Sequence, residues 1–97
     1  MIQSFADKGT QDVFDNIDSK AARRSCPKAL WPAAQRKLDL LDAAEVPEDL
    51  RAPPGNRLEP LKGDRKGQHS IRINQQYRIC FTWTASGPTD VEIVDYH

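Results

Sequence analysis

Residues 69–84 read HSIRINQQYRICFTWT and alternate between apolar and polar side chains. A period of two is typical of β-strands, because successive side chains on a strand point to opposite faces of the sheet. The alternation is interrupted by Asn-Gln-Gln at residues 74–76, which predicts a tight turn between two antiparallel strands. One face of this pair is predicted to be apolar. The other face is predicted to carry Ser70, Arg72, Arg78 and Cys80.

Further short strands are predicted on both sides of this pair. Residues 85–88 (ASGP) are a strong turn signal, and Val91 and Ile93 then restart an alternating pattern, with Val94 between the two faces. Residues 2–5 alternate as well. A loop region rich in Pro and Gly at 47–67 leaves room for a short strand at 57–61.

Two helices are predicted in the N-terminal half. The first is capped by Asp7 or Thr10. Its apolar face holds Val13, Phe14 and Ile17. Residues 18–29 are basic, contain Pro27, and are predicted to be irregular.

The second helix begins near Pro32, which suits a first helical turn because its missing N–H would have no partner there. It ends before Pro47. Its apolar stripe comprises Leu30, Ala34, Leu38 and Leu41. Helices that precede an antiparallel sheet predict an α+β fold with the helices on one face.

Length and composition limit the number of domains and the class of protein. Ninety-seven residues, with 38% hydrophobic and 29% charged side chains, predict a single domain over residues 1–97. No apolar run approaches the ~20 residues of a membrane span, and the N-terminus lacks a signal-peptide pattern. We therefore expect a cytoplasmic protein without a membrane partner, in which Cys26 and Cys80 are reduced thiols.

The formal net charge is zero, but the charges are segregated along the chain. Residues 19–38 carry six Lys or Arg and no acid, whereas residues 39–50 carry five acids. Residues 51–79 again carry seven Lys or Arg against two acids. The basic segments could bind phosphates, or they could be ordinary solvated surfaces.

Motifs for nucleotide, zinc or serine-hydrolase chemistry are absent from the sequence, and no metal or cofactor is expected. Arg78 is the first candidate, because it lies out of phase with the apolar residues of its strand. It either pairs with an acid such as Glu92 or faces a ligand. The second candidate is the loop at 58–67, whose cations either bind phosphate or are merely exposed: Lys62, Arg65 and Lys66.

The third candidate is the last triplet, Asp95-Tyr96-His97. It combines a carboxylate, a phenol and an imidazole, and histidine is a common general acid or base near neutral pH. A polar tail after a strand is the simpler interpretation of the same residues.

Three segments together resemble the HigB toxins, the plasmid maintenance system killer branch of the RelE/ParE superfamily. They are residues 57–74 (RLEPLKGDRKGQHSIRIN), 76–81 (QYRICF) and 91–97 (VEIVDYH). The resemblance covers essentially the whole chain. The lead-in at 53–58 (PPGNRL) is closest to the GraT-like chromosomal subgroup.

The resemblance implies the compact RelE-like fold, in which two helices pack on a twisted antiparallel sheet. It implies an endoribonuclease that cleaves mRNA at the A site of the 70S ribosome. It also implies a HigA-type helix-turn-helix antitoxin as partner, through which alone the toxin would reach operator DNA.

By resemblance, Asp95, Tyr96 and His97 match the family's catalytic segment, and Arg78 matches the arginine that stabilises the scissile phosphate. Lys62 and Arg65 match the basic loop, to which we add Lys66 and Arg72 as phosphate-binding candidates. Glu59 stands where many HigB sequences have a catalytic histidine, and it could act as the base instead. That departure leaves a second interpretation open, a ParE-like toxin that binds ribosomes, their precursors or a protein target without cleaving RNA.

Overall fold

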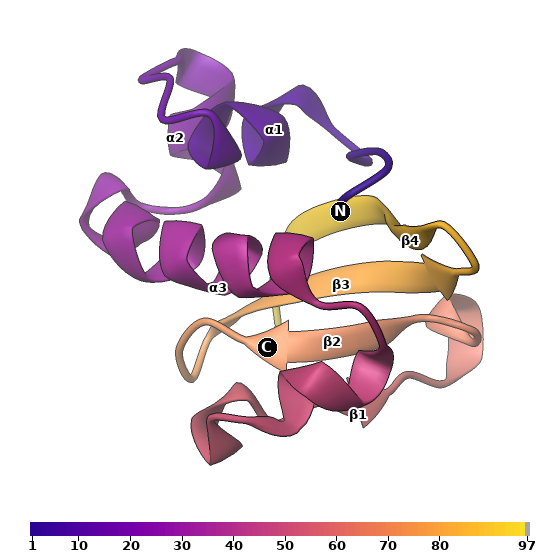
Figure 1. Ribbon diagram of the computed structural model, residues 1–97. Helices are drawn as coiled ribbons and strands as arrows, with labels where there is room; N and C mark the ends of the chain where they lie inside the picture. The colour runs from indigo at the N-terminus through magenta and orange to yellow at the C-terminus, as the bar shows by residue number, and fades with distance from the viewer. Residues whose placement is uncertain (97) are drawn as a thin grey trace.

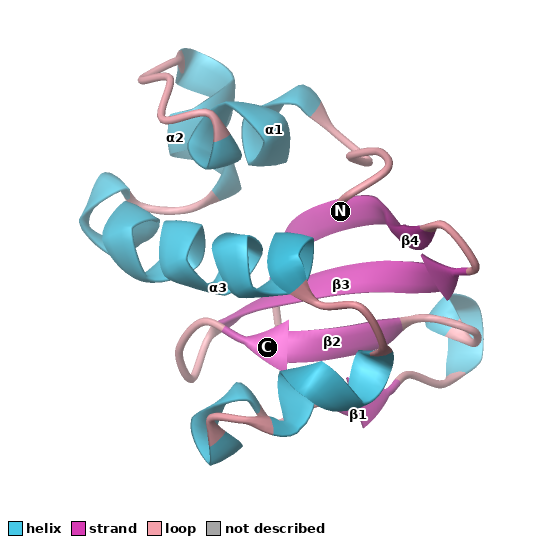
Figure 2. Ribbon diagram, viewed as in Figure 1, coloured by secondary structure: helices cyan, strands magenta, loops and turns pink. Residues whose placement is uncertain are grey.

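The computed structural model describes residues 1–96. Helices cover one face of a four-stranded antiparallel sheet of order β1-β2-β3-β4, which confirms the α+β fold (Figures 1 and 2). The strands are β1 (Glu59–Pro60), β2 (His69–Arg72), β3 (Tyr77–Thr84) and β4 (Gly87–Asp95). Within the described residues no helix is long and apolar enough to cross a membrane.

The β2–β3 hairpin forms where the alternating sequence predicts it. Asn74 closes its turn, since the Oδ1 atom accepts hydrogen bonds from the backbone N–H groups of Gln76 at 2.8 Å and Tyr77 at 2.7 Å. The register places Ser70 opposite Cys80 and Arg72 opposite Arg78. These polar side chains therefore share one face of the sheet, as predicted.

A register shift between Cys80 and Thr82 interrupts the β3–β4 ladder. Asp90 adopts a left-handed φ of 52° there, and the extra residue turns Val91 towards the helices. Val94 lies opposite Arg78, which puts it on the polar face. The predicted strand at 2–5 is reduced to one parallel bridge between Phe5 and Val91.

Three α-helices precede the sheet, α1 (Lys8–Phe14), α2 (Lys20–Ser25) and α3 (Trp31–Ala43). The predictions for Asp7 as the first cap and for Pro32 in the first turn of α3 are confirmed. The prediction that residues 18–29 are irregular is wrong, because Ser19 caps α2 by accepting from the Ala22 N–H at 3.0 Å.

Ile17 does not join the apolar face of α1, and it is 47% exposed. The helix ends at Phe14, and Asn16 follows with a left-handed φ of 59°, which carries Ile17 off the helical path. Gly9 allows α1 and α2 to cross closely, since a Cβ atom there would lie 2.4 Å from the Ala21 carbonyl oxygen.

Figure 1 shows α3 lying across one face of the sheet, and the core side chains lie between them. Ala34, Leu38 and Leu41 of α3 are completely buried against the apolar face that includes Ile79 and Phe81. Leu30 is only partly buried at the end of this stripe. The helices occupy the apolar face of the sheet. The residues that approach the polar face therefore come from the segment that precedes β2.

That segment is less irregular than the Pro and Gly content predicts. It contains the 3-10 turns η2 (Pro47–Arg51), η3 (Pro54–Asn56) and η4 (Gly63–Arg65) besides β1. Asn56 is buried and donates through Nδ2 to the carbonyl oxygens of Leu50 and Ala52, both at 3.2 Å. These bonds hold η2 and η3 together, and the pairing of β1 with β2 attaches the segment to the sheet.

Candidate functional site

Arg78 is the centre of the polar face. It lies on a central strand and is only 5% exposed. Its Nε atom donates to Ser70 Oγ at 2.7 Å, and its Nη2 atom donates to the Arg57 carbonyl oxygen at 2.8 Å. The guanidinium is therefore held from two elements of the fold, β2 and the segment before β1.

The acid beside Arg78 is Glu59, with Oε1 3.1 Å from Nη2. Glu92, which the sequence offered as the partner, instead pairs with Arg65 at 3.2 Å. The register explains the difference, because Glu92 lies opposite Cys80, one row away from Arg78. The Glu59 side chain is 52% exposed, so its carboxylate lies at the mouth of the site.

Tyr96 completes this group, since its ring centroid lies 5.7 Å from the Arg78 Cζ atom. The ring covers one side of the guanidinium by a cation–π contact, and Tyr96 itself is 42% exposed. Arg78, Glu59 and Tyr96 thus come together from β3, β1 and the residue after β4. His97, the predicted proton-transfer residue, lies outside the described residues.

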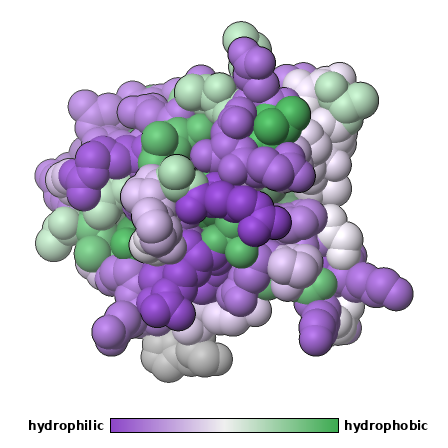
Figure 3. Space-filling model, turned by 60° about the horizontal axis from the view of Figure 1, so that its bottom comes forward, coloured by the Kyte–Doolittle hydropathy of each residue, from purple (hydrophilic) through white to green (hydrophobic). Residues whose placement is uncertain are grey.

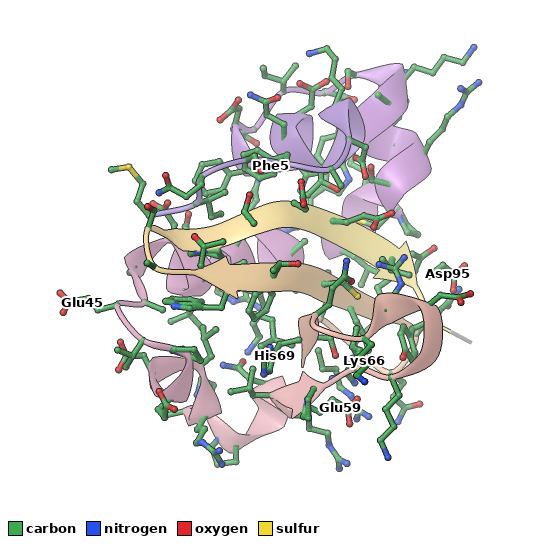
Figure 4. All side chains as sticks on the ribbon, turned by 90° about the vertical axis from the view of Figure 1, so that its right-hand side faces the viewer. Phe5, Glu45, Glu59, Lys66, His69 and Asp95 are labelled. Carbon is green, nitrogen blue, oxygen red and sulfur yellow. The ribbon has the colours of Figure 1, made fainter. Side chains whose placement is uncertain are left out.

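Asp95 does not join them. Its carboxylate accepts from Gln76 Nε2 at 3.2 Å and lines a cavity of about 470 Å³ beside α1 and α2. Figure 4 shows Asp95 at the end of β4, well separated from Glu59. Alternation along the strand accounts for this, because neighbouring residues point to opposite sides.

The predicted phosphate-binding cations have different surroundings. Lys62 and Lys66 are exposed on the loop before β2, whereas Arg65 is half-buried and already bound to Glu92 and Gln68. Arg72 lies directly opposite Arg78, and its buried Nε atom has no hydrogen-bond partner among residues 1–96. Two like charges facing each other across strands favour a bound anion.

The surface beside this site is hydrophilic. Figure 3 views the molecule from the β1 side, and there polar side chains surround only small apolar patches. Such a surface favours a charged and hydrated ligand over an apolar one.

The remaining reactive side chains are poor candidates for nucleophile or base. Burial raises the pKa of the Cys80 thiol, so it stays protonated near neutral pH. His69 stacks on Phe81, with ring centroids 6.2 Å apart, and so faces the helix side of the sheet. In residues 1–96 no group of three or more His, Cys, Asp or Glu could hold a metal ion.

The sequence did not single out Ser70 or the Arg57 carbonyl. A signal for Ser70 was present, because it is a polar residue in phase with Arg72 on a strand predicted to be paired with β3. No signal marked Arg57, since a backbone carbonyl carries no residue-type information.

Chemically, the site presents a buried cation with a fixed orientation, an exposed carboxylate and an aromatic ring. Nε and Nη2 are occupied, and Nη1 has no partner among the described residues, so the fork retains donors for an anion. A planar guanidinium matches the geometry of a phosphate, and a buried one interacts with it strongly.

The chain is similar to known proteins of one toxin family. Residues 3–97 match the family described as "RelE-like toxin of type II toxin-antitoxin system HigB". "Toxin HigB-1" of Vibrio cholerae serotype O1 is 46% identical over 83 residues, which are 86% of this chain and 84% of that protein. "Endoribonuclease HigB" of Proteus vulgaris is 30% identical over 97 residues and the full length of both chains.

A solved structure, the "YoeB-YefM complex from Staphylococcus aureus", has the same fold with a TM-score of 0.61 at 15% identity. The match covers 100% of this chain and 98% of that one. The chain therefore belongs to the HigB-like family of RelE-like toxins of type II toxin–antitoxin systems, which implies an antitoxin as its partner.

Proposed function

We propose that the chain is an endoribonuclease that cleaves mRNA on the ribosome by attack of a ribose 2′-OH on the adjacent phosphate. The observation that carries the proposal is the buried Arg78 guanidinium, held in place beside Glu59 and Tyr96. The name of the Proteus vulgaris relative, "Endoribonuclease HigB", supports the cleavage of RNA.

The reaction needs a base, a cation and an acid. The 2′-oxygen forms a bond to phosphorus after losing its proton to the base. The bond from phosphorus to the 5′-oxygen then breaks, and the acid protonates the leaving oxygen. The products are a 2′,3′-cyclic phosphate and a free 5′-OH. Dependence on the 2′-OH restricts the substrate to RNA.

In this proposal Arg78 stabilises the negative charge that develops on the phosphorane. Glu59 is the base, since its exposed carboxylate lies 3.1 Å from the same guanidinium. His97 is the acid that protonates the leaving 5′-oxygen. The Tyr96 ring lies over the guanidinium at the open side of the site and stacks on a base of the substrate.

The remaining candidates act around this centre. Arg72 and the exposed Lys62 and Lys66 bind flanking phosphates, which positions the RNA without reading its sequence. Arg65 contributes less, because Glu92 already neutralises it. Asp95 accepts from Gln76 and orients the C-terminal segment that carries His97.

The mRNA and the ribosome belong to this reaction, whereas the antitoxin is inferred from membership of the toxin–antitoxin family. The substrate is mRNA bound to the 70S ribosome, which implies a cytoplasmic site of action. A HigA-type helix-turn-helix antitoxin neutralises the toxin, and operator DNA is reached only through that antitoxin.

An end-mapped cleavage assay on one mRNA tests the proposal. The mRNA is presented naked and on programmed ribosomes, with wild type, Arg78→Ala, His97→Ala and the remote, exposed control Glu45→Gln. We expect cuts with cyclic-phosphate ends on ribosomes, retained by the control and lost in the other two variants. A folded and toxic wild-type protein that cuts neither naked nor ribosome-bound mRNA would refute nuclease activity. That result would favour the ParE-like binding toxin, which is considered because Glu59 replaces the family's histidine.

A further inference from the structure

We propose that Ser70 is a positioning residue, which together with the Arg57 carbonyl sets the plane of the Arg78 guanidinium against the scissile phosphate. The inference rests on the proposed nuclease function and adds a residue to it. Ser70 touches neither the reacting atoms nor the substrate, and it acts only through Arg78.

Two acceptors on different nitrogens determine the orientation of a rigid planar group. Ser70 Oγ accepts from Nε at 2.7 Å, and the Arg57 carbonyl oxygen accepts from Nη2 at 2.8 Å. Ser70 is completely buried, so water does not compete for this contact. With these two nitrogens held, rotation about the terminal bonds of the arginine side chain is blocked, and Nη1 points in one direction.

The chemistry of these two acceptors differs from that of Glu59. Both are neutral, so they orient the guanidinium without cancelling the charge that a phosphate needs. The Glu59 carboxylate is charged and half-exposed, so an incoming phosphate can take its place on Arg78. The neutral pair remains in contact throughout and keeps the arginine preorganised, which is how electrostatic stabilisation is made effective.

The backbone at Arg57 supports this assignment. Its φ of 47° lies in the left-handed region, which is unfavourable for a side chain other than glycine. This conformation follows η3 and directs the carbonyl oxygen towards Arg78. Helical turns often end in this conformation, so the end of η3 fixes the backbone at Arg57 independently of Arg78.

The test compares Ser70→Ala with Ser70→Thr, which keeps the hydroxyl, and with Ser70→Cys, whose thiol is a weak acceptor. Thr10→Val is the matched control for loss of a buried hydroxyl, since Thr10 Oγ1 accepts from the Ile93 N–H at 3.0 Å on the other face of the sheet. Each variant is measured for kcat and KM on programmed ribosomes and for Tm. The Arg78 Nε–H resonance is followed by ¹⁵N NMR.

We expect Ser70→Ala to lower kcat roughly 10–100-fold while KM changes little, since small misplacements of a catalytic group cost about this much. The Arg78 Nε–H signal should be protected from exchange with solvent in wild type and in Ser70→Thr. It should be lost through exchange in Ser70→Ala. Ser70→Thr should retain most of kcat and Ser70→Cys should be intermediate, which decides the question even if the alanine variant folds poorly. Thr10→Val should lower Tm and leave kcat unchanged.

Three results would overturn the positioning role alone. The first is that Ser70→Ala keeps full kcat while Arg78→Ala is inactive. The second is that Ser70→Thr loses as much kcat as Ser70→Ala. The third is that Thr10→Val loses as much kcat as Ser70→Ala. Wild-type protein that leaves mRNA intact would refute the proposed nuclease and this inference together. The wild-type lane therefore distinguishes the two failures.

Discussion

Replacing Glu59 by glutamine removes the negative charge beside Arg78 and keeps the shape of the side chain. In the resting protein the carboxylate lies 3.1 Å from Arg78 Nη2, with the two side chains 52% and 7% exposed. An RNA phosphate that approaches the guanidinium competes with this carboxylate at Nη2. Glu59→Gln therefore removes a competitor and, if Glu59 is the base, also removes the group that takes the 2′-OH proton.

The two effects differ greatly in size. A carboxylate as exposed as that of Glu59 forms an ion pair worth about 0.2–1 kcal/mol, because solvent screens it. Its removal should lower KM by roughly 1.5–5-fold, since about 1.4 kcal/mol corresponds to a factor of ten. Loss of a general base lowers kcat on the order of 10²–10⁴-fold. The loss of kcat should therefore dominate, and kcat/KM should fall steeply.

Single-turnover cleavage of mRNA on programmed ribosomes separates the effect on KM from the effect on kcat when the toxin concentration is varied. Glu45→Gln is the control, because Glu45 is exposed and far from the site, as Figure 4 shows. A variant with lower KM and unchanged kcat would refute the base assignment. Glu59 would then serve only to occupy Arg78 in the absence of RNA.

Other parts of the molecule give equally direct tests. Arg78→Lys keeps the charge but loses the planar fork, and we expect kcat to fall roughly 10²–10³-fold in the same assay. Leu38→Ala should lower the free energy of unfolding by about 2–5 kcal/mol in a urea titration, because Leu38 is completely buried between α3 and the sheet. A loss below about 1 kcal/mol would contradict this account of the core. Two hydrogen bonds hold the pKa of the Asp12 carboxyl below its usual value of 3.8. The bond from Ser19 has the larger effect and the bond from Lys8 the smaller. Because folding lowers this pKa, the stability from Asp12 is complete above pH 3.8 and is lost as the pH falls through the folded value. Asp12→Asn should therefore lower stability at neutral pH more than at about pH 3, and an equal loss at both would show that ionisation of Asp12 does not matter.

The regular elements were predictable where one face of the element is apolar. Alternation over residues 69–84 predicted β2 and β3, and the stripe through Leu38 and Leu41 predicted α3. The short helix α2 was missed, because six residues with one buried alanine carry no periodic signal. Its stability comes from contact with α1 at Gly9 and from the Ser19 cap, neither of which was predicted from the sequence.

The candidate site was predictable in part for the same reason. Arg78 stood out because a charged residue interrupts an apolar strand, but the pattern could not identify its acidic partner. Glu59 precedes Arg78 by 19 positions and reaches it through the pairing of β1 with β2 and of β2 with β3. That register depends on loop geometry, which the residue types of 61–68 do not reveal.

By itself the sequence determined the α+β class, the two faces of the hairpin and the residue types from which a phosphate site is built. These properties depend on local periodicity, which is written in neighbouring residues. Only the tertiary structure decided that Tyr96 contacts Arg78 while Asp95 faces the helices, and that Ser70 and the Arg57 carbonyl hold the guanidinium. Such choices arise when distant segments pack, because strand register and backbone direction set which side chains meet.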